Sequence, residues 1–136
     1  MIILKKYLLI LILLLCGCQN KQTLTCKYID YTSIYGKKII TDTIIFNNNI
    51  PVIYKKNINF SINNEIKEKN KIYKTLKLEA KTLKKYIKGK YKIIKQNDNI
   101  NMNFTSNKKF NLNYITTNTK YENIKQEYES IGYECK

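Results

Sequence analysis

Cysteine thiols are the side chains of this 136-residue chain with the clearest potential for chemistry. The four cysteines form two pairs: Cys16 and Cys18 are separated by one residue, whereas Cys26 and Cys135 lie at opposite ends of the polar part of the chain. A thiol can carry a lipid, form a disulfide or bind a metal ion. The surroundings of each pair decide among these chemistries.

Side chains for other kinds of catalysis are missing or scattered. The chain has no histidine, which is the usual general base near neutral pH. Its three aspartates and seven glutamates show no paired spacing, and its four glycines form no phosphate-binding loop. We therefore predict that the protein is not an enzyme and holds no cofactor, although catalysis by carboxylate, lysine or tyrosine side chains stays open.

The first cysteine pair ends an apolar run, Tyr7 to Cys18, which follows Lys5 and Lys6. A positive start, about a dozen apolar residues and a small residue before a polar stretch are typical of a secretory signal. The run is shorter than the ~20 residues that a membrane-spanning helix needs. We therefore predict an exported protein whose residues 1–17 are removed.

The succession Leu15, Cys16, Gly17 and Cys18 resembles the lipobox of bacterial lipoproteins. The resemblance implies that the Cys18 thiol is lipidated and that the chain is cut just before it, where Gly17 provides the small side chain that the cut requires. Residues 18–22 would then be a lipidated anchor and short polar tether, followed by a single domain.

The residue after Cys18 bears on the choice of membrane. Gln19 stands where, in the lipoproteins, an aspartate signals retention at the inner membrane. The resemblance thus implies lipid anchoring on the extracytoplasmic side of the cell membrane or outer membrane, with the outer membrane favoured in a cell that has two. A signal cut elsewhere and an uncleaved apolar anchor are the alternatives.

The charge is strongly positive. The formal net charge of +15 becomes +13 when Lys5 and Lys6 leave with the signal. Such a field attracts an anionic membrane or another anionic envelope component. Nucleic acid is not an expected partner, because the chain has no arginine for bidentate recognition and nucleic acid is scarce outside the cytoplasm. The abundance of Ile, Lys, Asn and Tyr is also what an AT-rich genome would produce.

The second cysteine pair is predicted to form a disulfide. Cys26 and Cys135 are the two thiols left after the signal is removed, and an even number in an oxidising compartment favours pairing. Two free thiols remain an alternative. A closed zinc site would need carboxylate ligands that the sequence does not place, so we predict no metal site.

The first part of the domain, residues 23–136, is predicted to be β structure. Leu24, Cys26 and Tyr28 alternate with polar residues, as in a strand with one buried face. A turn at Gly36, a strand over 38–46, a break at Asn47 to Asn49 and a third strand over 52–62 follow.

A helix is predicted from Asn63 or Asn64, as N-cap, to Gly89, as the residue after its C-terminal end. Its apolar stripe, which should lie on the sheet, consists of Ile66, Tyr73, Leu76, Ala80, Leu83 and Ile87. Leu78 falls outside this stripe. A neighbouring stripe, here called the lysine row, consists of Lys74, Lys77, Lys81, Lys84 and Lys88. The lysine row is either a contact surface for an anionic partner or an ordinary solvated face, and Glu65, Glu68 and Glu79 lie on the other flank.

The remaining segments predict a hairpin over 91–94 and 100–104, and alternation at Phe110, Leu112 and Tyr114 suggests a sixth strand. Thr119 to Glu122 matches a capping box, so a second helix should begin there and end at Gly132. The predicted fold class is α+β: an antiparallel sheet of five or six strands with two helices packed on one face.

The layout as a whole resembles small bacterial lipoproteins of the YehR-like kind. The resemblance rests on the lipobox, the strand at Thr25 and Cys26, the order of helices and hairpin, and the tail Ile131 to Lys136. It implies no assigned activity. We expect a monomeric structural or interaction module at the cell envelope, with an unknown protein or an anionic component as partner. The alternative is a small-ligand or lipid-binding module whose cavity is lined by Tyr28, Tyr73 and Tyr91.

Overall fold

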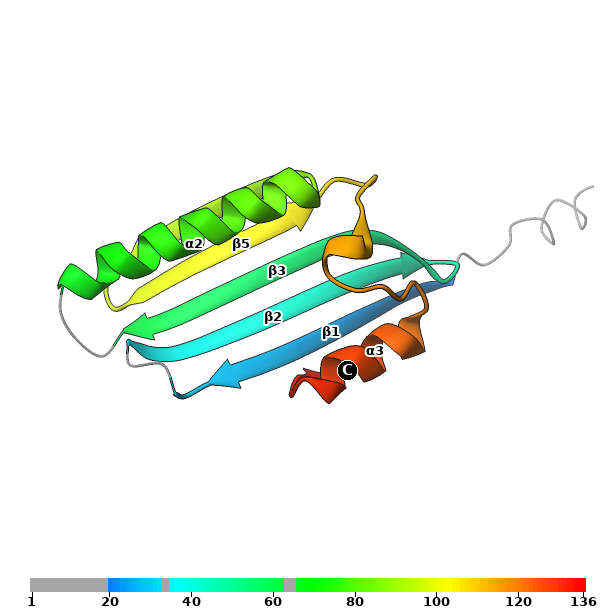
Figure 1. Ribbon diagram of the computed structural model, residues 1–136, viewed down its shortest axis with the longest axis horizontal. Coiled ribbons are helices and arrows are strands. Elements are labelled where there is room, and N and C mark those ends of the chain that lie inside the picture. Colours follow the sequence, from blue (N-terminus) through cyan, green and yellow to red (C-terminus); the bar gives the residue numbers. More distant parts are fainter. Residues whose placement is uncertain (1–19, 33–34, 63–65) are drawn as a thin grey trace, which may run out of the picture.

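The computed structural model describes residues 20–32, 35–62 and 66–136. A six-stranded antiparallel sheet forms one layer, and two helices cover one of its faces (Figure 1). The predicted α+β fold class is confirmed. In chain order the elements are β1 (Lys21–Asp30), β2 (Gly36–Asn47), β3 (Ile50–Ile62), α2 (Ile66–Tyr86), β4 (Gly89–Gln96), β5 (Asn99–Ser106), the 3₁₀ helix η1 (Leu112–Tyr114), α3 (Tyr121–Ser130) and β6 (Glu134–Cys135). The strand order is β4-β5-β3-β2-β1-β6.

Strict alternation along the central strands explains why one sheet face is covered and the other is not. Ile58 and Phe60 of β3 are buried on the helix side, level with Met102 and Ile100 of β5. The residues that alternate with these point to the opposite face, where Asn57 donates hydrogen bonds to the side-chain oxygens of its β5 neighbours Asn101 and Asn103. This face also carries Ile39, Ile45 and Ile53, which are only partly buried and lie outside the core cluster, so the core forms under the helices.

The buried stripe of α2 differs from the prediction by one residue. The side chains in the core are Ile72, Leu76, Ala80, Leu83 and Ile87, whereas Tyr73 is only partly buried at the edge of the core. Leu78 is 68% exposed on the outer side of the helix, as its place outside the stripe suggested. The side chain of Ile66 and the residues Asn63, Asn64 and Glu65 lie outside the described part of the chain.

The predicted role of Gly89 at the end of this helix is wrong. Lys88 takes the left-handed conformation there, with φ 61°, and Gly89 is the first residue of β4. A Cβ at position 89 would stand 2.3 Å from the carbonyl oxygen of Thr105. Glycine is therefore needed for the close approach of β4 to β5 and not for the end of the helix.

The C-terminal segment corrects two predictions. Residues Leu112–Tyr114 form η1 instead of a strand, and the sixth strand is β6, which pairs Cys135 with Cys26 of β1. The capping box is wrong because Lys120 is the N-cap residue of α3 and makes no side-chain capping bond. Gly132, with φ 94°, does follow the end of the helix, as predicted.

Candidate functional site

The predicted disulfide between Cys26 and Cys135 is confirmed. The two sulfur atoms are 2.00 Å apart and link strand β1 to the two-residue strand β6. The backbones of Thr25 and Lys136 exchange two hydrogen bonds of 2.9 Å beside it. The disulfide therefore fastens the C-terminal end of the chain to the edge of the sheet.

Other predicted site residues are placed as follows. Cys18 lies outside the described residues. Lys74, Lys77, Lys81 and Lys84 are exposed along α2, whereas Lys88 is exposed just beyond the end of the helix. Of the acidic flank, Glu79 faces the sheet, since it forms an ion pair of 3.2 Å with Lys56 of β3.

The three tyrosines proposed to line one cavity do not come together. The ring of Tyr28 packs against Tyr133 near the disulfide, with 5.3 Å between ring centroids. Tyr73 lies under the ammonium group of Lys95, and Tyr91 packs against the core. None of the three lines either of the cavities between helices and sheet described below, so this prediction is wrong.

A polar cluster that the sequence did not predict lies between the sheet and the two helices. It consists of Asp42 of β2, Tyr54 and Lys56 of β3, Glu79 of α2, Tyr128 of α3 and Tyr133. Asp42 is 4% exposed and accepts a hydrogen bond of 2.8 Å from the Tyr54 hydroxyl. The Tyr128 hydroxyl is buried and has no hydrogen-bond partner among the described residues. A cavity of about 190 Å³ reaches all of the cluster except Glu79.

Burial dominates the electrostatics of the cluster. It raises the pKa of the Asp42 carboxyl above its usual 3.8, although the charge of Lys56 opposes this rise. Burial and the charge of Asp42 together raise the pKa values of Tyr54 and Tyr128. For Lys56, burial alone lowers the pKa, but attraction by Asp42 and Glu79 outweighs it and the pKa is raised.

These shifts limit what the cluster can do chemically. The tyrosines remain protonated hydrogen-bond donors and Lys56 remains an ammonium ion, so none of them is activated as a nucleophile. The described residues contain no group of three or more acidic or cysteine side chains that could hold a metal ion. The tyrosines and Lys56 therefore serve as hydrogen-bond donors and balance the charge of the cluster.

Replacing Asp42 with Asn tests this account of the cluster. Because the pKa of Asp42 is raised on folding, the folded protein binds the proton more tightly than the unfolded chain does. The contribution of Asp42 to the free energy of unfolding therefore falls as the pH rises from about 4 through the raised pKa. Asn keeps an acceptor for Tyr54 without the buried charge. We expect the Asp42→Asn protein to gain stability over the parent between about pH 4 and pH 7 in urea unfolding. A variant whose relative stability falls over this interval would contradict the account.

A second cavity, here called the helix–sheet cleft, lies beside the middle of α2, from Lys71 to Glu79, and measures about 370 Å³. Phe60, Ile72 and Leu76 provide apolar walls. Lys38, Lys71, Asp30 and Glu79 also line it. The cleft thus combines apolar walls with charges of both signs, which suits a small amphipathic molecule.

One signal in the sequence could have revealed the polar cluster. Asp42 stands between Ile40 and Ile44 in the alternation of β2, and Lys56 stands between Tyr54 and Ile58 in that of β3. A charge at an inward position of a strand needs a buried partner. The sequence contains no comparable signal for the helix–sheet cleft, because the residues that line it are far apart in the sequence and come together only in the folded structure.

Comparisons with protein-family models, with curated proteins and with solved structures found no match. Within the described residues, no helix is long and apolar enough to cross a membrane. The structure itself shows a disulfide-linked α+β domain.

Proposed function

We propose that the protein is a lipid-anchored extracytoplasmic lipoprotein whose domain serves as a structural or interaction module at the cell envelope. The observation that carries the proposal is the sequence Leu15 to Cys18 at the end of a short apolar run that follows two lysines. The disulfide between Cys26 and Cys135 supports it, because stable disulfides are typical of exported proteins. The resemblance to YehR-like lipoproteins fits this role and adds no activity.

Two surfaces are available for an envelope partner. The exposed lysine row of α2 offers positive charge. The sheet face opposite the helices carries asparagine side chains such as Asn57 and Asn101. Figure 1 shows both helices on the other face of the sheet. Both suit an anionic or polar partner, such as an unknown protein or a polymer of the envelope. We propose that the domain acts as a monomer and without catalysis.

Detergent partitioning and protease treatment of intact cells test the proposed location. The native protein should collect in the detergent-rich phase, because two or three acyl chains, at ~0.8 kcal/mol per buried methylene, hold it in lipid. Protease added to cells, after removal of an outer membrane if one exists, should digest it. Recovery in the aqueous phase, or protection from the protease together with cytoplasmic markers, would refute the proposal.

The helix–sheet cleft favours a second candidate function, the binding of a small amphipathic ligand. Thr75 lines the cleft, and its hydroxyl donates a hydrogen bond to the carbonyl of Lys71 one turn earlier. Thr82 makes the same bond to Leu78 on the same helix, outside the cleft, and is the matched control.

A tryptophan at position 75 should fill part of the cleft. We expect Thr75→Trp to weaken binding of the apolar dye anilinonaphthalene sulfonate about tenfold, which corresponds to roughly 1.4 kcal/mol, whereas Thr82→Trp leaves binding unchanged. Dye titration of the two variants and the parent gives the comparison. Absence of dye binding to the parent, or equal loss in both variants, would eliminate this candidate.

A further inference from the structure

The start of the described chain is fixed to one end of the sheet. The backbone N–H of Asn20 donates to the side-chain oxygen of Asn48, and the N–H of Asn48 donates back to the carbonyl of Asn20, at 3.2 and 3.1 Å. Strand β1 begins at Lys21, two residues before the predicted start, so Lys21 and Gln22 are sheet residues and not a free tether. Asn20, which follows Cys18 by two residues in the sequence, therefore lies against the turn between β2 and β3.

This end of the molecule, here called the anchor end, has an exposed apolar tip between two grooves. Ile50, next to the turn, is 65% exposed. One groove, of about 720 Å³, is lined by Ile50, Tyr86 and Phe110, with Lys88 and Lys109 beside them. The other, of about 510 Å³, is lined by Ile45, Val52 and Ile53, with Lys21 and Lys108.

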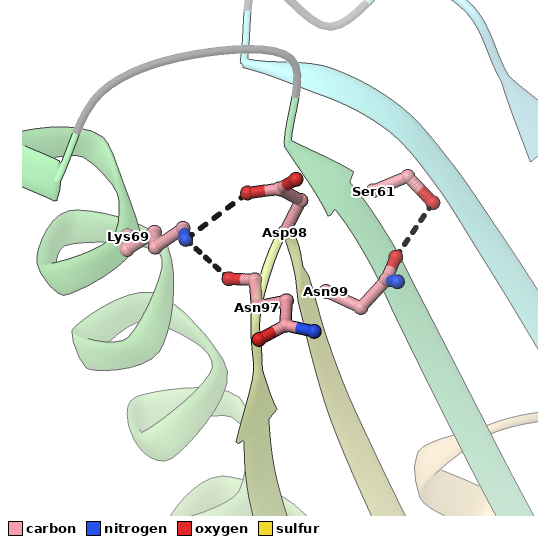
Figure 2. A network of polar contacts seen from close by, with 5 residues as sticks. All are labelled: Ser61, Lys69, Asn97, Asp98 and Asn99. Atoms are coloured by element: carbon pink, nitrogen blue, oxygen red, sulfur yellow. Dashed lines mark hydrogen bonds and ion pairs between the residues drawn. The ribbon is translucent and has the colours of Figure 1, made fainter.

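The charge of the anchor end is almost wholly positive. The segments that meet there, residues 20–21, 47–52, 84–90 and 107–122, contain eight lysines and a single carboxylate, Glu122. At the opposite end one of the lysines is paired with a carboxylate. Figure 2 shows Lys69 of α2 donating to the backbone carbonyl of Asn97 and forming an ion pair of 3.2 Å with Asp98 in the β4–β5 turn.

From this arrangement we infer that the anchor end docks onto an anionic phospholipid membrane. Ile50 enters the interface between head groups and acyl chains, and Lys21, Lys88, Lys108 and Lys109 contact the lipid phosphates. Amphipathic surfaces that combine exposed apolar residues with lysines bind such membranes in this way. The orientation rests on the proposed lipidation of Cys18, which would hold this end against the lipid, and the docking surface itself consists of described residues.

Vesicle binding by an unlipidated chain tests the docking surface independently of the lipid. A chain starting at residue 18 with Cys18→Ser contains every described element, since the core and the disulfide lie within residues 24–135. It should sediment with vesicles that contain phosphatidylglycerol, less so as salt rises, and not with pure phosphatidylcholine. Sedimentation with neither kind of vesicle would overturn the docking inference and leave the lipidation proposal intact. Absence of an acyl chain on the native protein would refute lipidation but would not change the result of the vesicle experiment.

Two sets of lysine replacements identify the surface. Changing Lys88, Lys108 and Lys109 to Gln should weaken binding roughly 100-fold, because each lysine near an anionic surface contributes about a factor of five. Changing Lys74, Lys77 and Lys81 of the lysine row removes the same charge and should change binding little. An equal or larger loss in the second variant would overturn the inference.

Tryptophan fluorescence then reports the orientation, since the chain contains no tryptophan of its own. Ile50→Trp should shift to shorter wavelength on anionic vesicles and be quenched by brominated lipid. The control is Tyr31→Trp, because Tyr31 is 72% exposed and follows the far end of β1. Its emission should stay unchanged. Quenching at position 31 without quenching at position 50 would contradict the proposed orientation.

Discussion

Removing the disulfide by Cys26→Ser and Cys135→Ser together lowers the free energy of unfolding by about 4–5 kcal/mol in our account. The disulfide closes a loop with a sequence separation of 109 residues. The chain-entropy model gives this magnitude for a loop of that length, because the cross-link restricts the unfolded chain. A domain of this size has a total stability of roughly 5–15 kcal/mol, so the double variant should be close to unfolding.

The native state also depends on this link locally. Strand β6 has only two residues, and it is otherwise held by the hydrogen bonds between Thr25 and Lys136 and by the packing of Tyr133 against Tyr28 and Tyr128. We expect the C-terminal strand to detach before the rest of the sheet unfolds. Amide hydrogen exchange at Thr25 and Lys136 should rise in the variant much more than exchange at Ile58.

Urea unfolding of the parent with and without reductant, beside the double variant, measures the effect. Reductant should destabilise the parent to the level of the variant and leave the variant unchanged. A loss below about 1 kcal/mol would contradict the entropic account, because a loop this long predicts several times as much.

Replacing Cys18 with Ser should release the protein from the membrane. Serine has no thiol, so it cannot take the lipid, and the acyl chains that hold the protein at ~0.8 kcal/mol per buried methylene are lost. We expect the membrane-bound fraction, measured after a high-salt wash, to fall from nearly all to nearly none. The wash matters because docking of the anchor end depends on charge and is screened by salt.

Cys16 provides the matched control. It lies two residues away in the same motif and leaves with the signal in our account, so Cys16→Ser should leave attachment intact. If Cys18→Ser stays bound after the wash, the apolar run from Tyr7 is an uncleaved anchor. If both variants lose attachment equally, the assignment of the lipidated residue is wrong.

The sequence revealed the parts of the fold that have a local period. Apolar and polar residues alternate along β1, β2, β3 and the β4–β5 hairpin because each strand buries one face and exposes the other, and this alternation predicts the strands. Strand β6 was missed because two residues carry no period, and its pairing depends on the disulfide partner. The segment around Leu112 shows the same alternation but forms the 3₁₀ helix η1. Three alternating residues are therefore too few to predict a strand.

The buried stripe of α2 shows a second limit. Ile72 and Tyr73 both fit the helical spacing of the stripe to within one residue; the spacing predicts Tyr73, whereas the structure buries Ile72. A tyrosine can lie at the edge of a core with its ring covered by a lysine, as Tyr73 does under Lys95. Hydrophobicity alone could not choose between the two.

The candidate sites depended still more on the fold. Both cysteines of the disulfide were identified from compartment and number alone. The polar cluster around Asp42 could be suspected from charges at inward positions, but its partners on α2 and α3 could not be named. The anchor end required the hydrogen bonds between Asn20 and Asn48, residues 28 positions apart, which no local pattern predicts.

Intact mass spectrometry of the native protein, purified from its own cells, tests the central claim most directly. Our account predicts a chain that begins at Cys18, lacks residues 1–17 and carries at least two acyl chains through the Cys18 thioether. A chain without an acyl adduct, or one that retains Gly17 and the residues before it, would contradict the account.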